Sequence, residues 1–199
     1  MDIDRLLPAP TPATTAAREV VVRYSSATLV NHCERSYLLS AALGNSLGVG
    51  MDEELLYVAT MLHDLALEEP FDNASMPFEV AGGFLASLFG AGAGWSPERR
   101  DHAARIVVDH MRDDTPVDED VEGYLLARAT TLDISGRGVD AWPEPLLREI
   151  VAAHPRLDLA ELFIARFDGQ AARKPSCSAA ASVRSGIAER IRSNPLERL

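Results

Sequence analysis

The sequence predicts an all-α protein that folds as a single domain of roughly seven to nine helices. Apolar residues recur with helical periodicity along most of the chain, capping residues stand between these segments, and the alternating pattern of strands is almost absent. A chain of 199 residues is most simply one domain, and it is long enough to bury roughly two-thirds of its unfolded surface. The composition, with 47% hydrophobic and 25% charged residues, is that of an ordinary globular protein.

The N-terminal part of the chain divides into an arm and the start of the helical domain. Residues 1–16 are rich in proline and are expected to form an extended or disordered arm, so the folded domain is expected to span 17–199. The first helix is expected over about 27–43, because apolar residues recur there with helical period. One serine of the pair 25–26 is expected to cap it.

The later helices each begin at a recognisable signal. Asp52 opens the second helix, and the two acids after it suit the positive end of the helix dipole. Pro77 starts a third helix that runs to about residue 90, where two internal glycines indicate close packing. Ser96 and Pro97 start a fourth helix that runs to about residue 111. The remaining periodic segments lie at about 119–133, 145–153, 158–173 and 178–192.

Charge and composition exclude several classes of partner. The formal net charge of −11 argues against a nucleic-acid backbone and against an anionic membrane surface, because both attract basic proteins. The chain has no apolar run that approaches about 18 residues, and its first residues lack the apolar segment of a secretory signal. Cys33 and Cys177 are the two cysteines, which favours a reduced compartment. We therefore expect a cytoplasmic protein.

Four polar side chains are expected to face the core. His32 and His63 each lie on the apolar stripe of their own helix, and Asp64 lies about 100° further around the helix from His63. Asp133 extends the stripe of a later helix. A single core histidine is usually just hydrogen-bonded, but a buried aspartate is costly unless it is paired or bound to a cation. Together these groups offer nitrogen and oxygen ligands for Zn, Mn, Fe or a similar divalent ion.

The chain resembles the HD-domain superfamily of metal-dependent hydrolases over about residues 24–140. Its motifs are an isolated histidine in "NHCERSYLL" (31–39), an adjacent pair in "MLHDLAL" (61–67) and a later aspartate in "LDISGRG" (132–138). The resemblance implies that the metal ligands are His32, His63, Asp64 and Asp133. It also implies one divalent ion per chain, with Zn as the first choice and Fe, Mn, Ni or Co as alternatives. Two-metal relatives supply further histidines after the pair, where this chain has Glu79.

The residues after the His-Asp pair indicate a subfamily. Many HD phosphohydrolases have His-Asp-x-Gly-Lys, and here Leu67 stands at the lysine position with Glu68 and Glu69 after it. These two acids are expected to repel a phosphate ester. "HDLAL" is instead similar to the HDLGL pattern of the cyanamide hydratase group, and "PFEVAGGFLASLF" and "IVVDHM" also resemble segments of that group. Ala66 and Met111 depart from the group's pattern.

Several polar residues have candidate roles beside such a centre. Glu79 either orients and deprotonates the reacting water or is only an acid in the first turn of its helix. His110 either donates a proton or contacts substrate, unless it is a simple core imidazole. Arg35 either anchors a substrate or pairs with a partner of a metal ligand. Asp64 is counted with Glu79 and His110 as catalytic because it would hold the metal that activates water.

The leading hypothesis is a metal-dependent hydratase or hydrolase that uses a metal-bound hydroxide on a small carbon–nitrogen substrate, with cyanamide to urea as the model reaction. One alternative is a phosphohydrolase of nucleotides or other phosphate esters, and another is a non-catalytic metal-binding sensor. The expected partner is a small molecule, with neither nucleic acid nor membrane. The C-terminal helices, about 145–192, match no motif. Their apolar faces cover either the core or a partner subunit, which leaves a homo-oligomer open.

Overall fold

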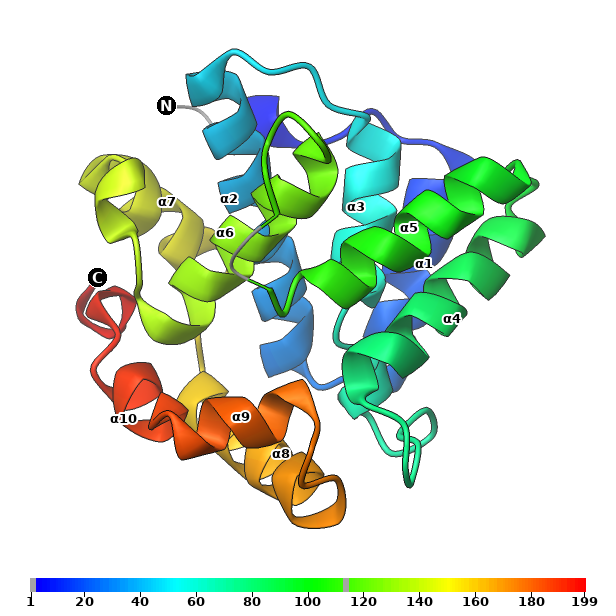
Figure 1. Ribbon diagram of the computed structural model, residues 1–199. Helices are drawn as coiled ribbons and strands as arrows, with labels where there is room; N and C mark the ends of the chain where they lie inside the picture. The colour runs from blue at the N-terminus through cyan, green and yellow to red at the C-terminus, as the bar shows by residue number, and fades with distance from the viewer. Residues whose placement is uncertain (1–2, 113–114) are drawn as a thin grey trace.

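The computed structural model describes residues 3–112 and 115–199 and is helical throughout (Figure 1). The described residues form ten α-helices and no strand, which confirms the predicted all-α class. The α-helices are α1 (Pro12–Tyr24), α2 (Ala27–Leu47), α3 (Glu53–Leu62), α4 (Phe78–Gly92), α5 (Pro97–Asp109), α6 (Val121–Ser135), α7 (Glu144–Ala153), α8 (Leu159–Arg173), α9 (Ser178–Arg184) and α10 (Ile187–Arg192).

The predicted helix starts are confirmed where a side chain caps them. The side chain of Ser26 accepts a hydrogen bond from the backbone amide of Leu29, and the side chain of Asp52 accepts one from the backbone amide of Leu55. Ser96 caps α5 in the same way. Each cap satisfies an amide that the first turn of a helix leaves without an internal partner.

Two differences raise the number of helices above the seven to nine expected. The last periodic segment divides into α9 and α10 because Gly186, with φ of 78°, takes the left-handed conformation that glycine tolerates. The N-terminal arm predicted for residues 1–16 is also wrong in part, because α1 begins at Pro12. Thr11 and Thr14 form a capping box there, and proline is well suited to the first position of a helix. Leu6, inside the predicted arm, is buried in the core.

The core is built around α2, which is buried along most of its length and packs against α3 and α6. The helices α4 and α5 pack side by side (Figure 1), and the two internal glycines of α4 permit this closeness. A Cβ atom on Gly82 would lie 3.0 Å from the carbonyl oxygen of His63, and one on Gly83 would lie 3.0 Å from that of Ala104. Gly82 therefore lets α4 approach the turn that carries the His-Asp pair.

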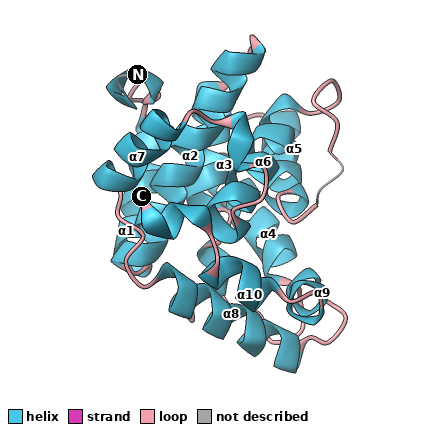
Figure 2. Ribbon diagram, turned by 90° about the vertical axis from the view of Figure 1, so that its left-hand side faces the viewer, coloured by secondary structure: helices cyan, strands magenta, loops and turns pink. Residues whose placement is uncertain are grey.

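The C-terminal helices α8, α9 and α10 gather at one end of the bundle, as Figures 1 and 2 both show. Their apolar side chains, including Phe163, Phe167 and Ile187, belong to the same core cluster as α2 and α3. These faces therefore cover the core of this chain. Among residues 3–112 and 115–199, no helix has both the length and the apolar character that crossing a membrane requires.

Candidate metal centre

The adjacent residues His63 and Asp64 lie where α3 ends. His63, the residue that caps the end of α3, still has helical backbone angles, whereas Asp64, with φ of −105° and ψ of 3°, does not. The change in direction brings the two side chains together, with Nε2 of His63 3.2 Å from Oδ2 of Asp64. Both side chains are buried. The end of the helix therefore allows two neighbouring residues to face one point.

His32 completes a triangle of ligand atoms. It comes from α2, and its Nε2 atom lies 3.2 Å from Nε2 of His63 and 3.3 Å from Oδ2 of Asp64. Two ligands on a tetrahedral Zn²⁺ with bonds of about 2.0–2.1 Å stand about 3.3–3.4 Å apart. The three edges of the triangle match that separation, so these residues fit a divalent ion that all three would hold.

The outer nitrogens of the histidines confirm which nitrogen is available. Nδ1 of His63 lies 2.6 Å from the carbonyl oxygen of Thr60, and Nδ1 of His110 bonds that of Val107. A carbonyl oxygen only accepts, so each Nδ1 must donate its hydrogen. When the ring is neutral, each Nε2 then has a lone pair that can bind a metal. Metal-binding histidines commonly have this protonation pattern.

Asp133 lies outside the triangle, which differs from the predicted ligand set. One of its carboxylate oxygens lies 2.6 Å from Nδ1 of His32, on the far side of that ring from Nε2. Arg35 and Arg156 also donate to this carboxylate, at 2.7 to 2.9 Å. With its oxygens so engaged, Asp133 orients His32 and strengthens it as a donor, a role that carboxylates often have behind a metal-binding histidine.

The contacts of Arg35 correct the prediction that it anchors substrate. Its guanidinium forms a two-pronged ion pair with Asp133, and Nη1 donates to the carbonyl oxygens of His154 and Pro155. The side chain is fully buried and is not among the residues that line the cavity. This geometry agrees with the alternative interpretation, in which Arg35 pairs with a residue that supports a metal ligand. That residue is Asp133, which bonds His32.

The pKa shifts reflect the concentration of charge at this centre. Burial by itself lowers the pKa of His32, but hydrogen bonds to the carboxylates of Asp133 and Asp64 outweigh it and raise the pKa. Burial by itself raises the pKa of Asp64, but the neighbouring His63 and His32 lower it well below the usual range. Asp64 is therefore ionised at neutral pH and provides the negative charge that a divalent cation needs.

His110 stands beside the triangle at the end of α5. Its Nε2 atom lies 3.7 Å from Oδ1 of Asp64, and its ring centroid lies 4.9 Å from that of His63. Burial, together with the nearby His63, lowers the pKa of His110 to about 4. The ring is therefore neutral near pH 7. Because His110 also lines the cavity, its predicted role as a proton donor or substrate contact stays a prediction.

Glu79 lies in the first turn of α4, and its Oε1 accepts a hydrogen bond of 2.6 Å from the hydroxyl of Ser178 at the start of α9. Its Oε2 is buried and has no hydrogen-bond partner among the described residues. Glu79 does not line the cavity that contains His32, His63 and Asp64. Its catalytic role therefore stays a prediction, beside the alternative of a helix-terminal acid.

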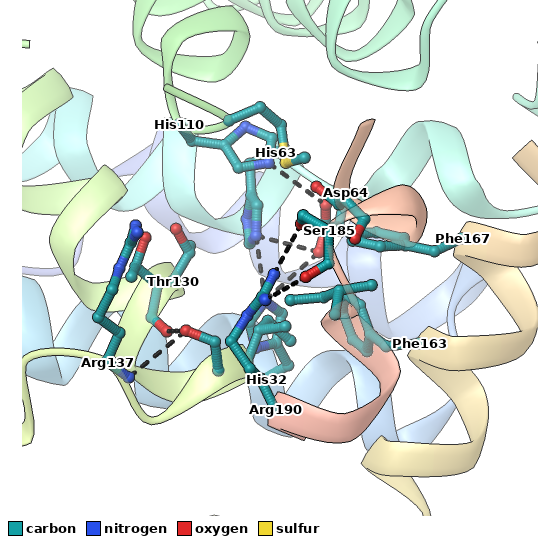
Figure 3. A pocket seen from close by; sticks show the side chains of 16 residues that line it. His32, His63, Asp64, His110, Thr130, Arg137, Phe163, Phe167, Ser185 and Arg190 are labelled. Atoms are coloured by element: carbon teal, nitrogen blue, oxygen red, sulfur yellow. Dashed lines mark hydrogen bonds and ion pairs between the residues drawn. The ribbon is translucent and has the colours of Figure 1, made fainter. Parts of the chain in front are cut away.

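A cavity of about 210 Å³ opens from the triangle (Figure 3). Its walls include Phe163 and Phe167 of α8, Arg137 after α6, and Ser185 and Arg190 at α9 and α10. None of these five residues was predicted from the sequence as a site residue. Arg137 lies within the segment 132–138, whereas the other four lie outside every motif and reach the centre only through the packing of the C-terminal helices.

The cavity mouth also differs from the one expected from the residues after the His-Asp pair. Leu67 is buried in the core, and Glu68 is bonded to Arg166 of α8 at 3.1 Å. Neither these two residues nor Glu69 lines the cavity. The expectation that Glu68 and Glu69 make the mouth repel phosphate is therefore wrong, because the chain turns away from the centre directly after Asp64.

An all-helical domain that gathers two histidines and an aspartate around one point belongs to the metal-binding helical proteins. The HD domain family matches residues 29–133, more than half of the chain, and the chain belongs to that family. It is also similar to two proteins of Saccharomyces cerevisiae, cyanamide hydratase DDI2 and cyanamide hydratase DDI3. It is 28% identical to each in an alignment of 176 residues that covers 85% of this chain and 78% of each relative.

Proposed function

We propose that the protein is a hydratase or hydrolase that adds water to a small carbon–nitrogen substrate, with the conversion of cyanamide to urea as the model reaction. The observation that carries this proposal is the triangle of His32, His63 and Asp64 at the inner end of a cavity. The similarity to the yeast cyanamide hydratases supports the choice of substrate. Zn is the first choice of metal because the ligands are two nitrogens and one oxygen.

A bound divalent ion supplies a Lewis acid that makes water acidic enough to react at neutral pH. The other steps belong to side chains of this chain. His110, neutral and with its Nε2 toward Asp64, is placed to accept a proton from the attacking water. Phe163 and Phe167 form an apolar wall that excludes bulk water from the reacting group.

Two further features bear on this proposal. The phosphohydrolase remains a second candidate, because Arg137 and Arg190 line the cavity and arginine binds phosphate well. Both cysteines are buried and unpaired, which supports the cytoplasmic compartment that we expect.

The experiment measures three quantities on one purified sample. These are metal content by mass spectrometry, urea formed from cyanamide, and phosphate released from nucleoside monophosphates. The proposal expects about one divalent ion per chain and metal-dependent urea formation. Phosphate release without urea formation would replace it by the phosphohydrolase. Bound metal with neither product would favour the non-catalytic sensor.

A further inference from the structure

We propose that the cavity has a second binding end, at Arg190, which recognises an oxyanion carried by the substrate. The substrate would then present its reacting group to the metal ligands and a carboxylate or phosphate group to Arg190. This inference rests on the proposed function, since it takes the same cavity as the substrate site. It assigns a specificity role to residues beyond position 133, where the HD domain match ends.

The guanidinium of Arg190 is fixed in a position that suits the binding of an anion. Its guanidinium donates to the carbonyl oxygen of Ser185 at 2.6 Å and to the hydroxyl of that residue at 2.9 Å. An arginine has five N–H donors, so these two bonds fix the group and leave donors for a ligand. Figure 3 shows the guanidinium turned inward, toward the side of the cavity where Asp64 lies. Within residues 3–112 and 115–199, Arg190 forms no ion pair with an acid.

The charge balance of the cavity also favours an anion. Asp64 is the one acidic residue among the described residues that line it, and its charge is committed to the metal triangle. Arg190, which forms no ion pair within residues 3–112 and 115–199, then gives the wall a positive charge, to which a bound divalent ion would add more. A cavity lined by one sign of charge concentrates ligands of the opposite sign.

The size of the cavity indicates a substrate longer than cyanamide. One water needs about 10–15 Å³ of such space, so 210 Å³ holds roughly a dozen waters or more. Cyanamide has only a few heavy atoms and would leave most of this space empty. Phe163 and Phe167 line the cavity together with hydroxyl side chains, which suits a substrate with a short apolar body and a polar end.

Calorimetric titration of the metal-loaded protein tests this inference with matched probes. Cyanoacetate carries a carboxylate, cyanoacetamide is its neutral counterpart of the same shape, and inorganic phosphate represents the other oxyanion. Arg190→Gln removes the charge, Arg190→Lys keeps the charge without the planar fork, and Arg192→Gln removes an equal charge from an exposed position of the same helix that does not line the cavity.

We expect the wild type and Arg192→Gln to bind cyanoacetate at least about tenfold more tightly than cyanoacetamide, because hydrogen bonds to a charged group are strong. The preference should disappear in Arg190→Gln at an unchanged melting temperature, and Arg190→Lys should restore only part of it. Inorganic phosphate identifies the source: a loss for phosphate larger than that for cyanoacetate assigns the end to a phosphate group, and the reverse assigns it to a carboxylate.

Equal affinity for the acid and the amide in the wild type would overturn the inference. So would a preference that survives in Arg190→Gln, since the anion would then bind the metal alone. The proposed function fails separately, if the metal-loaded wild type forms no urea while the preference for cyanoacetate persists.

Discussion

The ring of His32 connects Asp133 to the metal triangle. Nδ1 of His32 lies 2.6 Å from a carboxylate oxygen of Asp133, while Nε2 of the same ring lies 3.2 Å from Nε2 of His63. A carboxylate behind a histidine fixes the orientation of the ring and raises its basicity. The backbone carbonyl of Asp133 accepts hydrogen bonds from Arg156 and Asn194, so the C-terminal part of the chain supports a centre that it does not itself form.

Removal of a triangle ligand should remove the metal. His63→Ala and Asp64→Ala each delete one of three ligands, so we expect metal content to fall from about one ion per chain to near zero. His154→Ala is the matched control, because His154 is a partly buried histidine outside both groups of possible metal ligands and the substitution keeps the backbone carbonyl that accepts from Arg35. Metal content measured on the purified proteins decides the matter. Equal content in wild type and both ligand variants would refute the site.

The substitution Asp133→Asn tests whether Asp133 only orients His32 or itself binds the metal. If Asp133 only orients His32, metal affinity should fall by about 10–100-fold, as for other residues behind metal ligands. If it is a ligand, affinity should fall to the level of Asp64→Ala. Competition with a chelator measures both.

The same variant should also be less stable, because it leaves Arg35 without its buried counter-charge and Arg156 with Glu197 as its remaining acidic partner. Breaking a buried pair in this way typically lowers the free energy of unfolding by about 3–5 kcal/mol. Chemical denaturation of the metal-free protein measures this change. An unchanged stability would contradict the ion-pair arrangement described for Asp133.

The substitution Glu79→Gln distinguishes catalysis from a structural role. Glu79 is bonded to Ser178 and does not line the cavity, so we expect unchanged metal content, nearly unchanged turnover and a loss of at most about 1 kcal/mol of stability. Ser178→Ala should then have a similar small effect. A fall in kcat of about 10²–10⁴ at constant metal content would instead establish Glu79 as a general base.

The buried, neutral state of His110 predicts a pH dependence of stability in the metal-free protein. Its folded pKa of about 4 lies below the ordinary value of 6.5, so between these values the unfolded chain binds the extra proton. The neutral His110 therefore makes its full contribution to the free energy of unfolding above pH 6.5. As the pH falls toward 4, this contribution is lost, and the free energy of unfolding decreases by about 3 kcal/mol.

His110→Gln provides the comparison, because the amide can still donate to the carbonyl of Val107 but does not titrate. We expect the stability difference between wild type and variant to shrink or reverse as the pH falls from 7 to 4.5, measured by urea denaturation. His32 and Asp64 titrate in both proteins, so their effects largely cancel in the difference. A constant difference across this range would contradict the lowered pKa.

The sequence by itself determined the helices and the inner part of the centre. The signals for Ser26, Asp52 and Ser96 lie within a few residues of the structure that they cap, so they can be identified without knowledge of the fold. The same holds for the pair of His63 and Asp64, whose adjacency suits the end of a helix. The proline-rich start misled because proline also begins helices, as Pro12 does for α1.

Only the tertiary structure decided what surrounds the pair. Asp133 binds Arg35 from α2, which is 98 residues away in the sequence, and Arg156 from the connection between α7 and α8. Arg190 reaches the cavity because α10 packs against α6 and α8. Such contacts depend on which helix faces pack together over long sequence separations, and no local pattern encodes them. The residues that line the cavity around the pair could therefore be identified only from the folded chain.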